Sequence, residues 1–80
     1  MKITILSFGI AKDITGSRFL DWEMSEKASV AELRAALGSR FPALHELTSL
    51  RVAVNSEYAG DDLQLSENDE VALIPPVSGG

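Results

Sequence analysis

The last six residues of the chain combine two prolines, Pro75 and Pro76, with two glycines, Gly79 and Gly80. A Pro-Pro pair favours a stiff, extended backbone, whereas glycine tolerates nearly any backbone angle. Six extended residues span about 20 Å, so this segment would display the carboxylate of Gly80 at the tip of a thin arm. Such an arm could enter a narrow tunnel in another protein, where a larger side chain at either glycine would block its passage. The pattern predicts carboxylate chemistry that is completed in a partner's site.

A simpler explanation of the same residues is a frayed terminus or an expression remnant, since chain ends are commonly disordered. The two glycines by themselves do not decide between this explanation and a functional arm. The decision depends on the kind of domain that carries them.

The rest of the chain contains few residues of the types that catalyse reactions or bind metals. The sequence contains no cysteine and a single histidine, His45, which excludes disulfides, thiolate metal sites, a cysteine nucleophile and a histidine-rich metal site. It also shows no nucleophile–base pair and no glycine-rich phosphate loop. We therefore expect that this chain binds no metal and no cofactor, and that His45 has no functional role.

Length and charge narrow the function classes further. Eighty residues make one small domain, which is too small for a deep substrate cavity with its own catalytic machinery. Seven Lys and Arg residues against twelve Asp and Glu residues give a net charge of −5. This balance argues against binding to nucleic acid or to an anionic membrane, and it suits a basic partner protein. No apolar run approaches the roughly 20 residues of a membrane helix, and the N-terminal residues predict a strand, not a signal peptide. We expect a soluble, cytoplasmic protein.

Hydrophobic patterning predicts strands at residues 2–8, 18–24, 50–55 and 70–74, and a short strand or bridge at 63–65. Residues 2–8 and 70–74 are apolar at both parities, which is typical of central strands covered on both faces. The loop between the first two strands is rich in turn formers, and we expect a helical turn in it at residues 10–14.

The second strand alternates between apolar and polar side chains, which indicates one buried and one exposed side. The inward set is expected to be Arg18, Leu20, Trp22 and Met24, and the other parity, Phe19, Asp21 and Glu23, is expected to face outward apart from Phe19. A short loop separates this strand from the first, so the two should form an antiparallel hairpin.

A helix is predicted after Ser29, because Ser29 and Glu32 fit a capping box. Val30, Leu33 and Leu37 follow at helical spacing and form one apolar stripe. The helix should end near residues 39–40, because Pro42 disfavours helix at the residue before it.

The resulting order, two strands, a helix and then further strands, fits an α+β domain of the β-grasp, or ubiquitin-like, architecture, provided that the two terminal strands pair in parallel. A mixed sheet would then pack on one main helix, with a domain at residues 1–74 and an extended tail at residues 75–80. A β-grasp body together with a Gly-Gly end favours the functional arm over a frayed terminus.

Three stretches of the chain resemble the family of small, sulfur-carrying subunits of molybdopterin synthase, which are ubiquitin-like proteins. Residues 5–16 resemble the opening strand and loop of that family, residues 52–55 its A-V-N motif, and residues 68–80 its ending. The ending Pro-Pro-Val-Ser-Gly-Gly is quite specific, whereas Gly-Gly alone is shared by many ubiquitin-like carriers. Two departures are mild: Lys12 stands where arginine is common, and Asn68 replaces a turn glycine.

The resemblance implies a mechanism in which this chain carries sulfur. An E1-like enzyme would use ATP to adenylate Gly80, and sulfur from a donor protein would displace AMP to leave a thiocarboxylate. The tail would then enter the large subunit of the synthase, where two sulfur transfers convert cyclic pyranopterin monophosphate to the dithiolene of molybdopterin. Acid–base groups would belong to the large subunit, and the family's assembly is a heterotetramer of two small chains on a large-subunit dimer.

The resemblance also implies an apolar docking surface around the root of the tail. The candidates are Phe8, Lys12, Tyr58, Leu73, Ile74, Pro75, Pro76, Val77 and Ser78. Apolar strand residues usually pack inward, which favours the core for Phe8, Leu73 and Ile74, whereas Tyr58 follows a turn and is a better exposed anchor. Trp22 is expected in the core or on a face of the sheet. The acidic turn of Glu67, Asp69 and Glu70 is expected to be solvated, although it could steer the chain toward a basic partner.

Several functions remain open at this point. The chain could be the sulfur carrier for thiazole synthesis, although such carriers are typically shorter and lack the Pro-Pro pair. It could be a ubiquitin-like modifier that forms isopeptide bonds through Gly80, or a β-grasp binding module with an inert tail.

Overall fold

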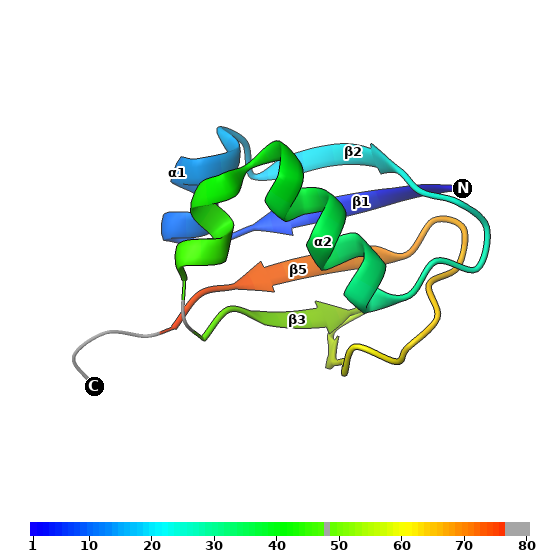
Figure 1. The fold of residues 1–80 in the computed structure, drawn as a ribbon. Coiled ribbons are helices and arrows are strands. Elements are labelled where there is room, and N and C mark those ends of the chain that lie inside the picture. Colours follow the sequence, from blue (N-terminus) through cyan, green and yellow to red (C-terminus); the bar gives the residue numbers. More distant parts are fainter. Residues whose placement is uncertain (48, 77–80) are drawn as a thin grey trace.

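The computed structural model describes residues 1–47 and 49–76. Its strands are β1 (Lys2–Ser7), β2 (Phe19–Glu23), β3 (Arg51–Val54), β4 (Glu57–Tyr58) and β5 (Glu70–Ile74), and its helices are α1 (Ile10–Thr15), α2 (Val30–Arg40) and the 3-10 helix η1 (Pro42–Glu46). The strands form one mixed sheet in the order β2-β1-β5-β3-β4 (Figure 1). Two strands from opposite ends of the sequence thus lie side by side at the centre of the sheet.

The central pair runs in parallel, with Ile5 beside Val71 and Ser7 beside Leu73. β2 and β3 flank this pair in antiparallel orientation. The arrangement confirms the predicted β-grasp architecture, including the hairpin of the first two strands. Because parallel strands end at the same edge of a sheet, Phe8 and Pro75, the residues that follow β1 and β5, leave it at the same end of the molecule.

Helix α2 begins and ends where the sequence predicts. Ser29 Oγ accepts a hydrogen bond from the amide of Glu32 at 3.2 Å, and the Glu32 carboxylate accepts one from the amide of Ser29 at 3.5 Å, which completes the capping box. Val30, Leu33 and Leu37 are buried in the core. The helix stops at Arg40, two residues before Pro42.

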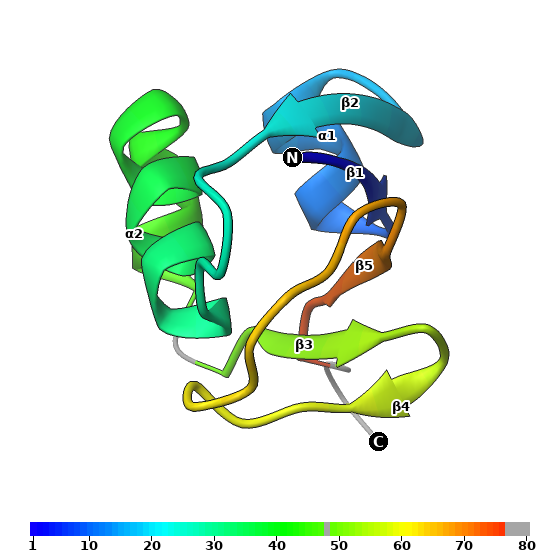
Figure 2. The same cartoon turned by 90° about the vertical axis from the view of Figure 1, so that its right-hand side faces the viewer.

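The two faces of the sheet differ in how far other parts of the domain bury them. Helix α2 lies along one face (Figure 2), where Ile3, Ile5, Val71 and Leu73 are at most 1% exposed. The other face of the central strands is only partly buried. The prediction that residues 2–8 and 70–74 are covered on both faces is therefore wrong. The domain itself covers the apolar side chains on the second face only in part.

Two features around the edge strands were predicted wrongly or missed. Arg18 was expected to point inward, but β2 begins only at Phe19, and Arg18 is exposed. Strand β4 was missed because it has only two residues, too few for an alternating pattern. It forms because Asn55 and Ser56 adopt φ angles of 50° and 74°, the left-handed values of a tight hairpin turn.

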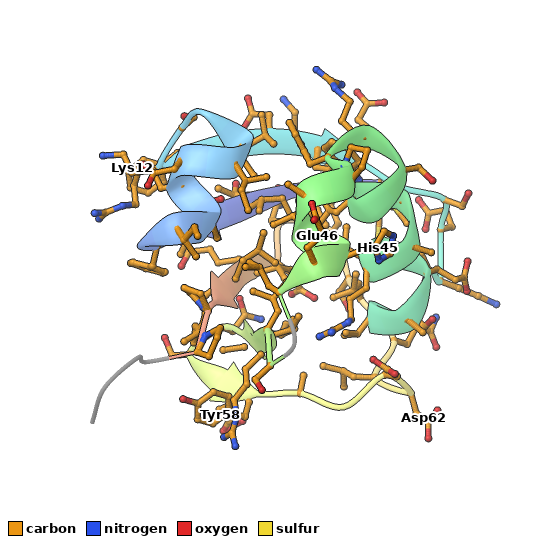
Figure 3. The ribbon with its side chains drawn as sticks, turned by 60° about the vertical axis from the view of Figure 1, so that its left-hand side comes forward. Lys12, His45, Glu46, Tyr58 and Asp62 are labelled. Carbon is orange, nitrogen blue, oxygen red and sulfur yellow. The ribbon has the colours of Figure 1, made fainter. Side chains whose placement is uncertain are left out.

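The 3-10 helix η1 was not predicted, and it places the ring of His45 against Gly38 of α2. A Cβ atom built on Gly38 would overlap that ring. His45 lies beside the helices, away from Tyr58 (Figure 3). The glycine therefore permits a close approach between η1 and α2.

Candidate functional site

One row of side chains crosses the whole sheet on the face that α2 leaves uncovered. The strand register places Leu6 between Phe19 and Ala72, and Ala53 between Ala72 and Tyr58. Directly paired residues point to the same face of a sheet, so these side chains share one face. The aromatic residues at the two ends of the row, Phe19 and Tyr58, are 65% and 66% exposed.

A second row lies two residues nearer to the tail. Ile74 pairs with Arg51, and Phe8 follows the end of β1 with 37% of its surface exposed. We define the open face as the two rows together: Leu6, Phe8, Phe19, Arg51, Ala53, Tyr58, Ala72 and Ile74. It is apolar at its centre and borders directly on the root of the tail at Pro75.

Three depressions in the described part of the surface meet at Tyr58. A depression of about 330 Å³ lies on the open face and includes Phe8 and Ala72. Another, of about 360 Å³, joins Tyr58 to Ile74, Pro75 and Pro76 at the root of the tail. These volumes can accept side chains of a docked protein, and Tyr58 stands between them.

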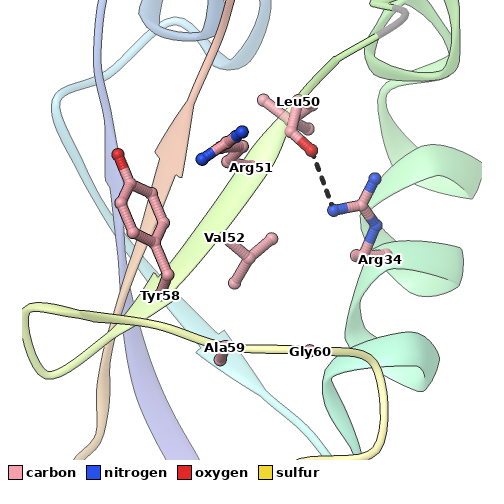
Figure 4. Close-up of a pocket in the computed structure, with 7 residues that line it drawn as sticks. All are labelled: Arg34, Leu50, Arg51, Val52, Tyr58, Ala59 and Gly60. Atoms are coloured by element: carbon pink, nitrogen blue, oxygen red, sulfur yellow. Dashed lines mark hydrogen bonds between the residues drawn. The ribbon is translucent and has the colours of Figure 1, made fainter.

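The third depression, of about 350 Å³, lies at the edge of β3 beside α2 (Figure 4). Two cationic side chains line it, Arg34 from α2 and Arg51 from β3. Arg34 Nη1 donates a hydrogen bond of 3.0 Å to the carbonyl of Leu50. This contact ties the start of β3 to the helix, so the residues next to the open face are held by the core.

An arginine side chain lies over each of two aromatic rings near the tail, those of Phe8 and Tyr58. The guanidinium carbon of Arg18 lies 5.0 Å from the ring centre of Phe8, and that of Arg51 lies 5.3 Å from the ring centre of Tyr58. These distances are typical of cation–π contacts. The apolar centre of the open face is therefore flanked by a positive charge on each side.

The root of the tail is packed closely against the start of α1. Gly9 adopts a φ of 53°, and a Cβ atom built there would lie 3.4 Å from Cγ of Pro75. A larger residue at Gly9 would be strained by this backbone angle. The loop after β1 and the segment after β5 thus lie side by side.

The predicted docking residues are partly brought together. Phe8, Tyr58 and Ile74 share the open face, Pro75 is half-buried, and Pro76 is exposed. Lys12 is exposed on α1, well apart from Tyr58 (Figure 3). Two further residues belong to the other face: Leu73 is fully buried and Trp22 packs near Phe41, with ring centres 6.5 Å apart. The predicted tail residues Val77, Ser78, Gly79 and Gly80 lie outside the described residues.

The acidic turn before β5 is built into the fold. Asn55 Nδ2 donates to Asp69 at 2.9 Å, and the amide of Glu70 donates to Asn55 Oδ1 at 3.0 Å. The carboxylate of Asp69 also accepts the amide of Ser66 at 2.8 Å, within a turn where Asn68 has the predicted left-handed φ, 68°. Asn55 thereby joins the end of β3 to the start of β5, which gives a structural reason for the A-V-N motif.

Sequence reasoning missed Leu6, Phe19, Arg18, Arg51 and Ala72 as residues near the site. Their individual types carry no distinctive signal. What assembles them is the register between strands that are far apart in the sequence, with Leu6 beside Ala72 and Ile74 beside Arg51. The sequence offered one hint, the apolar Phe19 at the parity of Asp21 and Glu23; it was excepted from the outward set, but the structure leaves it 65% exposed.

The site offers a docking surface without a catalytic set. Among residues 1–47 and 49–76, no group of three or more His, Cys, Asp or Glu side chains could hold a metal ion. Within the same residues, no helix has the length and apolar character needed to cross a membrane. The predicted reactive group, the carboxylate of Gly80, lies outside the described residues.

The comparisons with known proteins agree on the kind of domain. The model of the ThiS family matches residues 5–80. A molybdopterin synthase sulfur carrier subunit from Arabidopsis thaliana is 36% identical over 81 residues, which cover 100% of this chain and 84% of that protein.

Two solved structures are similar over the full length of this chain and of theirs. One is SAMP1 from Haloferax volcanii, with 28% identity and a TM-score of 0.86. The other belongs to the complex of subunits 1 and 2 of the molybdopterin-converting factor from Helicobacter pylori, with 25% identity and a TM-score of 0.71.

Proposed function

Because the chain belongs to the ThiS family, we propose that it is the sulfur carrier subunit of a molybdopterin synthase. The observation that carries this proposal is similarity over the whole chain to a protein of that name, together with the ending Pro-Pro-Val-Ser-Gly-Gly. The lack of a catalytic set among the described residues is consistent with a carrier, whose acid–base groups belong to its partners.

The chemistry takes place at the carboxylate of Gly80. A carboxylate is a poor electrophile, so an E1-like enzyme first activates it: a carboxylate oxygen attacks the α-phosphate of ATP, pyrophosphate leaves, and an acyl-adenylate forms. Sulfur at the oxidation level of sulfide, delivered by a donor protein as HS⁻, then attacks the carbonyl carbon, the carbon–oxygen bond to AMP breaks, AMP leaves, and the thioacid loses its proton. ATP belongs to the activating enzyme, and the product on this chain is a thiocarboxylate.

The large subunit of the synthase then accepts the loaded tail. The open face docks onto it through Phe8, Tyr58 and Ile74, with Lys12 as a peripheral charge, and Pro75 and Pro76 direct the chain away from the sheet. Val77, Ser78 and Gly79 thread into the active site of the large subunit. There the thiocarboxylate sulfur attacks cyclic pyranopterin monophosphate and links the pterin to Gly80 as a thioester. Water then hydrolyses the acyl carbon–sulfur bond, so that the sulfur stays on the pterin and the Gly80 carboxylate is regenerated. Two such transfers, each from a freshly loaded chain, make the dithiolene of molybdopterin.

The test is intact-mass spectrometry of the full chain after incubation with ATP, an E1-like activating enzyme and a sulfur donor. We expect the mass to rise by the difference between one sulfur and one oxygen atom, and addition of the large subunit with cyclic pyranopterin monophosphate to return it to the starting value. A reaction without ATP and a chain lacking Gly80 are the controls, and neither should gain mass. An unchanged mass in the complete reaction would rule out the carrier function.

A second candidate is a ubiquitin-like modifier, which the similarity to SAMP1 favours at 28% identity over both full chains. Activation of Gly80 would be the same, but a lysine amine of a target protein would attack the carbonyl carbon and form an isopeptide bond. Immunoblots of cells that express the tagged chain separate the two functions. Covalent conjugates that disappear on deletion of Gly80 would establish the modifier, and their absence would leave the sulfur carrier.

A further inference from the structure

Positive and negative charges lie at opposite ends of the open face, although the whole chain is acidic. At the end near the tail it carries Arg51, paired with Ile74, and it borders on Arg18, whose backbone carbonyl accepts the amide of Ser7. Four residues further from the tail along β5, Glu70 pairs with Thr4, which Asp21 flanks from β2 on the same face. Positive charge thus accompanies the apolar docking rows, and negative charge begins where those rows end.

The two arginines are held at defined places. Each guanidinium carbon lies within about 5 Å of the ring that stands beside it, 5.0 Å for Arg18 on Phe8 and 5.3 Å for Arg51 on Tyr58. A ring face offers no oxygen acceptor, so the planar guanidinium keeps N–H donors for a carboxylate. A partner that covers Phe8 and Tyr58 therefore meets both arginines in fixed positions.

We propose that the protein surface that docks on the open face is acidic and places carboxylates opposite Arg18 and Arg51. This inference rests on the proposed function, and it specifies the chemistry of the partner's surface. Arginine binds a carboxylate through two parallel hydrogen bonds, which fixes geometry as well as charge. The net charge of −5 alone favours a basic partner, so the local and the global charge make opposite predictions.

The polarity of the face also selects one orientation. If the partner turned by half a turn on the sheet, its carboxylates would meet Asp21 and Glu70, and like charges in contact oppose binding. The favoured orientation keeps the arginines, and with them Pro75 at the root of the tail, over the partner's acidic positions. Specificity for one docking pose then comes from charge, while the apolar rows supply contact area.

The test compares association rates of the full chain with the large subunit of the synthase from the same organism, at low and at high salt. The variant Arg18→Gln/Arg51→Gln should associate about tenfold more slowly at low salt and lose most of its salt dependence, because charges at an interface act mainly on the association rate. The matched control is Arg40→Gln/Lys27→Gln, which removes the same charge. Arg40 makes the same kind of contact, 5.4 Å from the Phe41 ring, and neither residue lies on the open face, so its rate should stay within about twofold of the unchanged chain.

A third variant, Arg18→Lys/Arg51→Lys, separates charge from geometry. It should keep the association rate and dissociate faster, because an ammonium group cannot make the paired hydrogen bonds of a guanidinium. Melting curves check that all variants are folded. Faster association of the glutamine variant would mean a basic partner surface and would overturn the proposal, as would an unchanged rate or an equal loss in the control. If the unchanged chain does not bind the large subunit, the proposed function fails together with this inference; binding that ignores the arginines defeats this inference alone.

Discussion

At the scale of single residues, Tyr58 is the side chain on which the docking surface depends most. It is 66% exposed and lines all three depressions described above. Tyrosine supplies a large, amphipathic contact area and is enriched among residues that dominate binding energy. Because it pairs with Ala53 only through the two-residue strand β4, its ring contributes little to the core.

We therefore expect Tyr58→Ala to weaken binding to the large subunit by about 2 kcal/mol, or at least tenfold in Kd, with little loss of stability. Isothermal titration calorimetry measures the affinity. Leu63→Ala is the matched control, because Leu63 is 45% exposed and its carbonyl accepts the amide of Val30 at the far end of α2. Equal affinities for the Tyr58 variant and the unchanged chain would remove Tyr58 from the interface.

A substitution of Lys12 tests whether the docking surface extends from the open face to α1. It is exposed on α1, at the end of the molecule from which the tail leaves. Lys12→Glu should slow association with the large subunit several-fold at low salt, because a charge reversal at the border of an interface changes the rate of encounter. Surface plasmon resonance measures the rate, with Lys27→Glu as the control, since it makes the same reversal beyond the end of β2. An identical slowing in both variants would assign the effect to net charge and not to Lys12.

At the scale of elements, the turn after β3 is joined to the start of β5 through one side chain. Asn55 adopts a left-handed φ of 50° and bonds to both Asp69 and the amide of Glu70. Asn55→Gly removes the two side-chain hydrogen bonds and should lower the free energy of unfolding by about 1–2 kcal/mol. Asn55→Ala should cost about 1 kcal/mol more, since alanine is strained at that angle.

Urea denaturation measures both values. Asn68→Gly serves as the control, because Asn68 has a similar φ of 68°, which glycine adopts without strain. If Asn55→Gly were as stable as the unchanged chain, the hydrogen bonds to the acidic turn would contribute nothing, and the A-V-N motif would need another explanation.

The sequence predicted those elements whose cause is local. The capping box of Ser29 and Glu32 located α2, Pro42 ended it, and the apolar run at residues 70–74 gave β5 its observed bounds. Strand β4 was out of reach because two residues show no period, and η1 because its packing on Gly38 depends on α2. Sequence analysis is limited in the same way for the open face. Apolar residues such as Leu6 predict burial, but their spacing does not show whether this domain or a partner protein buries them.

At the scale of the whole molecule, the proposed function divides between a folded body that docks on the partner and an arm that carries the reactive carboxylate. The sequence predicts the arm, because Pro-Pro-Val-Ser-Gly-Gly is a local motif. It did not identify the open face, because this surface joins five strands through pairings such as Leu6 with Ala72 and Ala53 with Tyr58. The parallel pairing of β1 and β5 brings the two parts together, since both strands end beside Pro75.

This division predicts that stability and carrier function can be separated at the last residues. The buried core ends with Leu73, so deletion of Gly80 should leave the melting temperature unchanged while it abolishes molybdopterin formation in a reconstituted synthase assay, because the carboxylate no longer reaches the site. Gly79→Leu keeps a terminal carboxylate and should fail as well, since its side chain obstructs threading into the large subunit. Full synthesis by the shortened chain would disprove the role of Gly80, and a shortened chain that melts earlier would point to a structural cause. A deletion variant that still binds the large subunit with little change in affinity would place recognition on the open face and chemistry on the arm.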